Sequence, residues 1–189
     1  MSAQSNTVYI LSGEWKGRKI TFPSLPGLRP GTGVMRECLM SWIRFDIKNA
    51  TILDAFTGSG ILGLDALSEG AAHVDAIDQS KLVIRHLSES AHFLPPGCLN
   101  LFQGSFPTNI PTEITNKAYD FIFLDPPYDS DLLAQSLQYL EDSSMLNASS
   151  KVFIHYPKGK ITLSSAWKTL KTSHRRHHIF SLIQLHKIK

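Results

Sequence analysis

From about residue 50 onward, short apolar segments alternate with segments of helical periodicity, and this alternation constrains the fold more than any other feature. Strands are expected at 51–56, 73–78, 99–104, 119–125 and 151–157, and helices at 61–69, 81–93 and 130–140. Such alternation requires crossover connections, which give a mostly parallel sheet covered on both faces. Residues 167–187 contain two more strands without a helix between them, which predicts an antiparallel hairpin at one sheet edge. The sequence therefore predicts a doubly wound α/β domain whose ligands bind beyond the carboxyl ends of the strands.

The segment before residue 50 has a different pattern. Residues 7–13 and 17–23 are short β-type segments joined by a polar turn, and residues 32–45 have the apolar spacing of one helix. We therefore expect residues 1–49 to form an N-terminal hairpin and helix extension of an α/β domain at residues 50–189. A chain of 189 residues is long enough to form one compact unit with a substantial core.

The composition is that of an ordinary globular protein, with 42% hydrophobic and 19% charged residues. No apolar run approaches the roughly 20 residues that a membrane span needs, and the N-terminus lacks the charged start and apolar core of a signal peptide. The only cysteines, Cys38 and Cys98, are isolated in the sequence, which favours a reducing compartment over a disulfide scaffold. We therefore expect a cytoplasmic protein.

The net charge of +3 conceals an uneven distribution of charge. Residues 1–50 contain seven Lys and Arg against three Asp and Glu, residues 51–150 three against thirteen, and residues 151–189 nine against none. Basic side chains release counterions from phosphates on binding, so a polyanion is a natural partner, although a solvated basic surface explains the same charges. The run Ser173–His178 is expected to be an exposed polar turn whose arginines favour phosphate contacts, rather than a metal site.

A glycine-rich turn joins the first strand of the regular region to its first helix. Gly58, Gly60 and Gly63 fit the G-x-G-x-x-G pattern, and Asp78 ends the next strand 20 residues after Gly58. The pattern predicts a backbone that approaches a ligand closely and an acid that binds ribose hydroxyls, which suits both NAD and S-adenosylmethionine. Glycines used only for a tight turn would give the same pattern. Asp54 favours S-adenosylmethionine, because its carboxylate repels a pyrophosphate and attracts ammonium and sulfonium groups.

The segment Asp125–Tyr128 has the sequence DPPY and directly follows a buried apolar strand. Proline cannot donate to a sheet ladder and has a fixed φ, so the strand must end at Asp125 on a stiff backbone. The Asp125 carboxylate and the Pro126 carbonyl can accept both hydrogens of an exocyclic amine and direct its lone pair at a methyl carbon. Tyr128 can stack on an extruded base. The motif therefore predicts amino-group methylation without a covalent nucleophile.

Together these motifs resemble those of the bacterial methyltransferases that modify the exocyclic N2 of a guanine in small-subunit (16S) ribosomal RNA. DPPY matches the [D/N/S]PP[Y/F] motif of amino-group methyltransferases, and residues 54–60, DAFTGSG, match their donor-binding motif. Residues 13–19, GEWKGRK, and residues 28–43, LRPGTGVMRECLMSWI, are similar to the family's N-terminal motifs. The similarity runs from about residue 7 through DPPY, and more loosely through the last strands.

The resemblance implies a Rossmann-like class I methyltransferase fold with a seven-stranded, mostly parallel sheet, and S-adenosylmethionine as the cofactor. It implies a monomer without metal or membrane that acts on ribosomal RNA or on a small-subunit assembly intermediate. The catalytic residues that it implies are Asp125, Pro126, Pro127 and Tyr128. The cofactor-binding residues that it implies are Asp54, Phe56, Thr57, Gly58, Ser59, Gly60, Asp78, Gln79, Gly104 and Ser105. The residues that it implies for RNA contact are Lys16, Arg18, Lys19, Arg29 and Arg36.

The chain departs from the family pattern in three places. Residues 31–34, GTGV, replace T-x-D-R, which loosens a segment that would close over donor or substrate. Ser105 stands where an acid is usual, so a hydroxyl or a backbone amide would hold the adenine, and residues 153–159 lack the expected glutamate. The alternatives left open are an amino-methyltransferase for DNA or another RNA, at adenine N6, and a nicotinamide-dependent oxidoreductase. A catalytically silent RNA-binding module is a further alternative, which leaves Asp125 and Tyr128 without a role.

Overall fold

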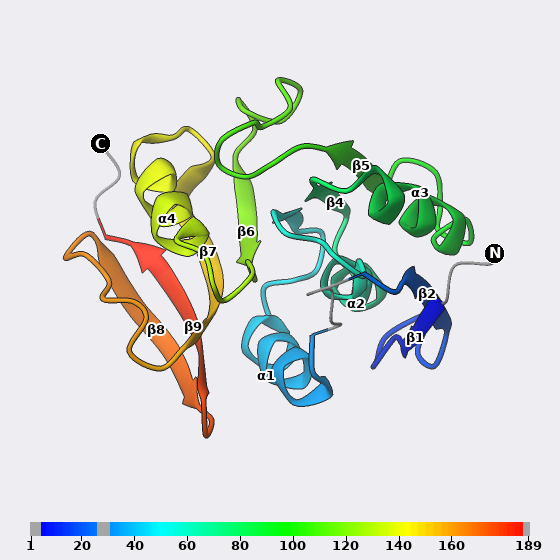
Figure 1. Ribbon diagram of the computed structural model, residues 1–189, viewed down its shortest axis with the longest axis horizontal. Helices are drawn as coiled ribbons and strands as arrows, with labels where there is room; N and C mark the ends of the chain where they lie inside the picture. The colour runs from blue at the N-terminus through cyan, green and yellow to red at the C-terminus, as the bar shows by residue number, and fades with distance from the viewer. Residues whose placement is uncertain (1–4, 26–30, 187–189) are drawn as a thin grey trace.

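The computed structural model describes residues 5–25 and 31–186, and Figure 1 shows a central sheet with helices packed on it. Its seven strands have the order β5-β4-β3-β6-β7-β9-β8. Their bounds are β3 Thr51–Asp54, β4 His73–Asp78, β5 Leu99–Gln103, β6 Tyr119–Leu124, β7 Leu146–Pro157, β8 Trp167–His174 and β9 His178–Leu185. The strands β3 to β7 pair in parallel, whereas β9 is antiparallel to both of its neighbours. The predicted mostly parallel sheet with an antiparallel C-terminal hairpin is confirmed.

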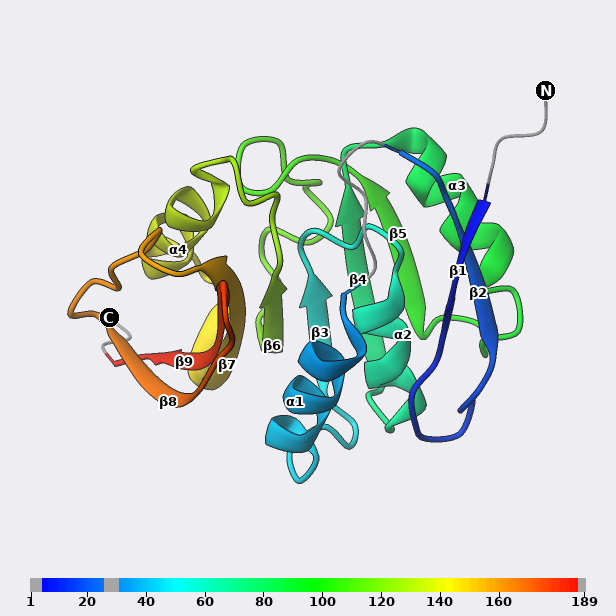
Figure 2. The same ribbon diagram turned by 60° about the horizontal axis from the view of Figure 1, so that its bottom comes forward.

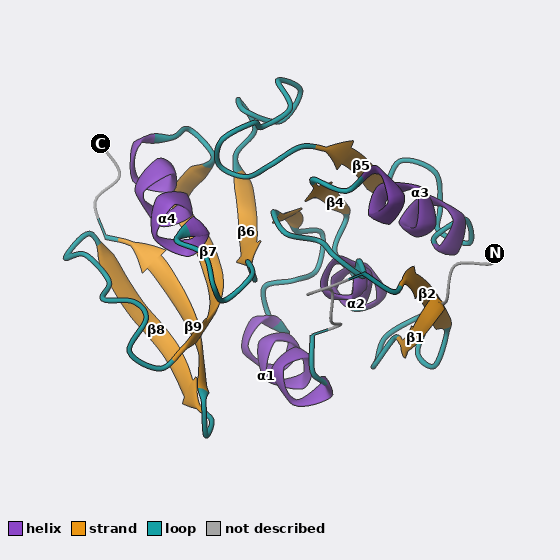
Figure 3. Cartoon of the chain, viewed as in Figure 1, coloured by secondary structure: helices purple, strands orange, loops and turns teal. Residues whose placement is uncertain are grey.

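The helices cover the two faces of the sheet, as Figure 3 shows by element type. Their bounds are α1 Gly33–Ile43, α2 Ile61–Ser68, α3 Lys81–Ser90 and α4 Leu132–Asp142. Successive side chains of β6 point to opposite faces, so Phe121 and Phe123 pack with α1, α2 and α3, whereas Ile122 and Leu124 pack with α4. All four side chains are at most 2% exposed, as expected for a strand buried on both faces. None of the described helices is long and apolar enough to cross a membrane.

The N-terminal hairpin forms a separate two-stranded sheet from β1 (Ser5–Tyr9) and β2 (Lys19–Pro23). Figure 2 shows it beside α3, where the hydroxyls of Thr21 and Ser90 are 3.0 Å apart. The turn between its strands is bonded to the C-terminal end of α2, because the backbone N–H groups of Glu14 and Trp15 donate to Ser68. The hairpin is therefore anchored to the two helices that follow the first two parallel strands.

Several element boundaries differ from the sequence-based expectation, among them those of α3 and β7. The helix α3 ends at Ser90 instead of residue 93, because residues 91–94 form a turn before Pro95. The strand β7 begins at Leu146, five residues earlier than expected, and its first part is the polar segment Asn147–Ser150. Polar residues with no alternating pattern gave no strand signal there, although Tyr119 of β6 pairs with Leu146.

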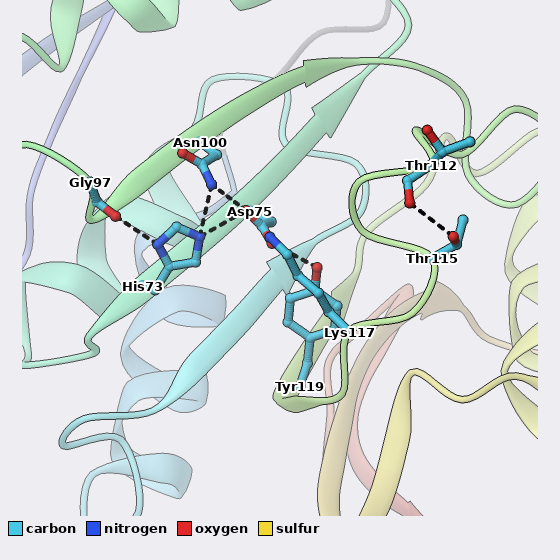
Figure 4. A network of polar contacts seen from close by, with 8 residues as sticks. All are labelled: His73, Asp75, Gly97, Asn100, Thr112, Thr115, Lys117 and Tyr119. Carbon is cyan, nitrogen blue, oxygen red and sulfur yellow. Dashed lines mark hydrogen bonds and ion pairs between the residues drawn. The ribbon is translucent and has the colours of Figure 1, made fainter.

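A buried carboxylate links β4 to β5, the edge strand of the sheet, and to the start of β6 (Figure 4). Asp75 of β4 is fully buried and accepts hydrogen bonds from Lys117 at 2.8 Å, Tyr119 at 2.7 Å and Asn100 at 3.0 Å, with His73 at 2.8 Å. Burial alone would raise the pKa of Asp75, but these hydrogen bonds outweigh burial and hold the pKa below its ordinary value. The network joins β4 to β5 and to the segment that leads into β6.

Candidate active site

A cavity of about 430 Å³ lies beyond the carboxyl ends of β3, β4, β5 and β6. It falls within the range of about 300–1,000 Å³ that is typical of small-molecule sites, and at the edge that the fold class predicts. Of the predicted cofactor-binding and catalytic residues, the structure brings twelve together in its wall: Phe56, Thr57, Gly58, Ser59, Asp78, Gln79, Gly104, Ser105, Asp125, Pro126, Pro127 and Tyr128. Gly31, from the segment that departs from the family pattern, also lines it.

The glycine-rich turn has backbone conformations that only glycine adopts easily. Gly60, which precedes α2, has a φ of +77°, and a Cβ atom there would lie 2.4 Å from a methyl group of Leu87. Gly58 has a φ of +51°, and its N–H donates to Oδ2 of Asp78 at 3.0 Å. The other oxygen of Asp78 accepts from the N–H of Ser80 at 2.8 Å. Gly60 therefore shapes the turn without lining the cavity, and Asp78 is held rigidly at the cavity wall.

Asp54 lies behind the cavity wall and is 1% exposed. Burial raises its pKa to about 7, the hydrogen bond from the Thr57 hydroxyl at 3.0 Å opposes this rise, and the nearby Asp125 carboxylate adds to it. A buried carboxylate of this kind gains from a cation placed beside it, because a cation favours its ionised form. Asp54 is thus electrostatically suited to a positively charged ligand rather than to a phosphate.

The DPPY segment follows β6 directly and forms the opposite wall of the cavity. Oδ1 of Asp125 is 2.9 Å from Nδ1 of His155, and the Asp125 side chain is 21% exposed. An ionised carboxylate only accepts hydrogen bonds, so Nδ1 of His155 carries the hydrogen when Asp125 is ionised. Oδ2 has no hydrogen-bond partner among the residues that the structure describes. One oxygen is therefore fixed by the protein, and the other can accept a hydrogen bond from a ligand.

Two histidines that were not predicted to belong to the site, His155 and His178, lie against the DPPY tyrosine. The ring centroid of Tyr128 is 5.2 Å from that of His155 on β7 and 4.7 Å from that of His178 at the start of β9. Burial, followed by the neighbouring His155 and His177, lowers the pKa of His178 and so favours its neutral form. His155 lies in the predicted strand 151–157, but its position beside Asp125 follows from the register in which Leu124 pairs with Ile154.

The predicted RNA-contacting residues are not gathered at the cavity. Lys16, Arg18 and Lys19 are exposed, but they lie in or beside the hairpin turn that is bonded to Ser68, at the end of α2 remote from the cavity. The Arg18 guanidinium also lies 3.9 Å from the centroid of the Phe93 ring. Arg29 lies outside the described residues.

The expectation that Arg36 faces RNA is wrong. Arg36 is 2% exposed, and its guanidinium makes two hydrogen bonds, at 2.6 and 3.0 Å, to the carboxylate of the fully buried Asp65. It also donates to the carbonyl of Tyr9 at 2.7 Å. The pair joins α1 to α2 and to the hairpin, so its role in this structure is to hold the N-terminal extension on the domain.

Comparisons with known proteins agree with the fold. A family model described as conserved hypothetical protein 95 matches residues 8–183. Ribosomal RNA small subunit methyltransferase D of Escherichia coli strain K12 is 32% identical over 86% of this chain and 82% of its own length. The protein of the same name from Buchnera aphidicola subsp. Acyrthosiphon pisum is 33% identical over 89% of this chain and 88% of its own.

Superpositions on solved structures also support the fold. A chain from Escherichia coli that is named as a methyltransferase superposes with a TM-score of 0.84 at 28% identity, over 95% of this chain and 98% of its own. A chain from Haemophilus influenzae that is named as a methylase superposes with a TM-score of 0.78 at 24% identity, over 95% and 99% of the two chains. The identity to the second structure is low enough that it supports the fold alone.

Proposed function

The chain belongs to the conserved hypothetical protein 95 family and is a methyltransferase, and from this premise we propose that it methylates the exocyclic N2 amine of a guanine in small-subunit ribosomal RNA, with S-adenosylmethionine as the donor. The relatives named above act on small-subunit ribosomal RNA according to their names. The observation that carries the proposal is the cavity that joins the glycine-rich turn and Asp78 on one wall to the DPPY segment on the other.

We assign residues at the cavity to the ribose, the ammonium group and the adenine of the donor in turn. The carboxylate of Asp78, held by two backbone N–H groups, would accept hydrogen bonds from the ribose hydroxyls. Asp54 would balance the charge of the ammonium group, which suits a buried carboxylate with a raised pKa. The adenine would lie against Gln79, Gly104 and Ser105. Phe56, Thr57, Gly58 and Ser59 complete the wall, and Gly60 shapes the turn.

The DPPY segment would hold the acceptor amine for in-line attack. The donor supplies an electrophilic methyl carbon on a sulfonium. Oδ2 of Asp125 and the carbonyl of Pro126 would accept the two amine hydrogens and aim the nitrogen lone pair at that carbon. The Asp125 carboxylate would stabilise the positive charge that the amine nitrogen gains as it takes the methyl group from the sulfonium, until a proton leaves to water. Tyr128, which is 40% exposed, would stack on the base, and Pro127 stiffens the loop.

Donor affinity is expected to fall as the pH decreases through about 7, because Asp54 must be ionised to attract the ammonium group. The carboxylate is mostly ionised at pH 8 and mostly protonated at pH 6, so the Kd of S-adenosylhomocysteine should be about tenfold higher at pH 6. Thr57→Val removes the hydroxyl that stabilises the ionised form, so it should move this transition to higher pH. Calorimetric titration across the range measures both effects.

The matched control for this titration is Asp54→Asn, which has the same shape and no ionisation. It should bind S-adenosylhomocysteine more weakly, with an affinity that hardly changes between pH 6 and pH 8. An equally flat profile for the unaltered protein would show that Asp54 does not interact with the donor.

His155 is expected to act as a positioning residue for Asp125. His155→Leu removes the N–H group that fixes Oδ1, and a hydrogen bond to a charged group contributes about 1.5–3 kcal/mol, so kcat should fall roughly 10- to 100-fold. The Kd of S-adenosylhomocysteine should change little, and the KM for RNA should rise less than kcat falls, because the His155 ring also contacts Tyr128. His155→Gln restores an N–H donor and should recover much of the loss, whereas equal losses in both variants would indicate that His155 serves only packing.

The function itself is tested with labelled S-adenosylmethionine and ribosomal RNA from a strain that lacks the gene, followed by mass spectrometry of the nucleosides. We expect label in the small-subunit RNA and its recovery as N2-methylguanosine. Label recovered as N6-methyladenosine would support amino-group methylation but show that the target base is adenine instead of guanine. Label absent from RNA, with a protein that still binds the donor, would overturn the proposed substrate.

A further inference from the structure

Two segments that are distant in the sequence form one surface at the carboxyl edge of the sheet. Pro157, at the end of β7, pairs with His178 at the start of β9. The N–H of Lys158 donates to the carbonyl of His177 at 3.1 Å, and the N–H of Arg175 donates to that of His178 at 2.8 Å. The loop that begins at Lys158 and the β8–β9 turn are therefore held together by backbone hydrogen bonds.

This surface is strongly basic. Its cations are the exposed side chains of Lys158, Lys160, Arg175 and Arg176, with the exposed His177 between them, and we call them the basic turn cluster. None of its four cations forms an ion pair with a described acidic residue. No Asp or Glu occurs in the sequence after Asp142. The positive charge of the cluster is therefore available to an external anion.

The basic turn cluster directly adjoins the DPPY tyrosine. The ring of His178, which follows the turn, lies 4.7 Å from the ring of Tyr128. A small hollow beside the main cavity is lined by Tyr128, His155 and Lys160 together. By contrast, Lys16 and Lys19 lie at the end of α2 remote from the cavity. A strand that delivers a base to Tyr128 must therefore pass close to this cluster.

We propose that the basic turn cluster binds the RNA phosphates that flank the target nucleotide, and that it thereby delivers the base to Tyr128. The inference rests on the proposed function, because it takes RNA as the substrate of the cavity. Arginine forks and lysine ammonium groups are the usual partners of backbone phosphates, and such contacts fix the register of a nucleic acid without reading its sequence. The cluster is thus a docking surface, whereas the choice of base belongs to the cavity.

The test compares Arg175→Gln/Arg176→Gln and Lys158→Gln/Lys160→Gln with the unaltered protein. Each double variant should raise the KM for ribosomal RNA on the order of 10- to 100-fold at about 0.1 M salt, and reduce the slope of log affinity against log salt by about 1.5–2. The Kd of S-adenosylhomocysteine should stay the same, because these side chains do not line the donor cavity. All four side chains are exposed, so thermal unfolding should be almost unchanged.

The matched control is Arg44→Gln/Lys48→Gln, which removes two positive charges, as each test variant does. These exposed residues lie just before β3, on the side of the sheet where the parallel strands begin. It should change RNA affinity less than about twofold at moderate salt, since charges beyond a Debye length are screened. Equal effects of the turn and control variants would overturn the docking surface. Direct binding of an RNA fragment can be measured by fluorescence anisotropy. This measurement needs no methyl transfer, so failure of the docking surface is distinguishable from failure of the proposed function.

Discussion

Replacing Asp125 by alanine should lower kcat for methyl transfer about 10²- to 10³-fold, the usual cost of losing one preorganised electrostatic group at the reacting centre. Asp125 lines the cavity and has one oxygen fixed by His155, so its second oxygen is oriented before substrate binds. The variant loses both the acceptor that orients the amine and the negative charge that stabilises the developing ammonium. Single-turnover kinetics with saturating donor and RNA measures the chemical step directly.

Donor binding distinguishes this catalytic role from a general disturbance of the cavity. The Kd of S-adenosylhomocysteine for Asp125→Ala should lie close to that of the unaltered protein, because Asp125 is assigned to the acceptor side. Asp142→Ala, at the exposed end of α4, provides a control for removal of a carboxylate elsewhere and should retain full activity. Full activity of Asp125→Ala would remove the basis for the catalytic assignment.

Replacing Arg36 by alanine should reduce the free energy of unfolding by about 3–5 kcal/mol, because it leaves the carboxylate of Asp65 buried without its cation. Burial raises the pKa of Asp65, the hydrogen bonds and charge of Arg36 oppose that rise, and the backbone N–H of Leu11 opposes it further. For a chain of this size the loss corresponds to a decrease in Tm of roughly 6–20 °C. Urea or thermal denaturation followed by circular dichroism measures it.

The double variant Arg36→Met/Asp65→Leu removes both charges and should recover part of this stability. Recovery should be incomplete, because the N–H of Leu11 and the carbonyl of Tyr9 lose their partners. An Arg36→Ala protein with unchanged stability and greatly weakened RNA binding would restore the role that the sequence first indicated for Arg36.

The elements that sequence reasoning predicted well are those whose signals are local. Gly58 and Gly60 have positive φ angles, so their positions in the sequence directly reported the turn beside the cavity. The prolines after Asp125 similarly reported the end of β6. Because the carboxyl ends of parallel strands meet at one edge, local signals after three different strands were enough to predict which residues share a cavity.

The features that sequence reasoning missed depend on partners that are distant in the sequence. Arg36 had the appearance of a surface cation, and only its packing against Asp65, 29 residues later, makes it a buried residue. The pairing of His155 with Asp125 depends on the register between β6 and β7, which no local pattern specified. The proximity of His178 to Tyr128 depends in turn on β9 pairing with β7 rather than with β6.

Calorimetric titration of the protein with S-adenosylhomocysteine, in parallel with NAD, is the most direct test that the cavity beyond β3 and β6 is a methyl-donor site. We expect one molecule of S-adenosylhomocysteine to bind per chain, and no binding of NAD, whose pyrophosphate would lie close to Asp54. Binding of NAD without binding of S-adenosylhomocysteine would contradict the assignment of the cavity.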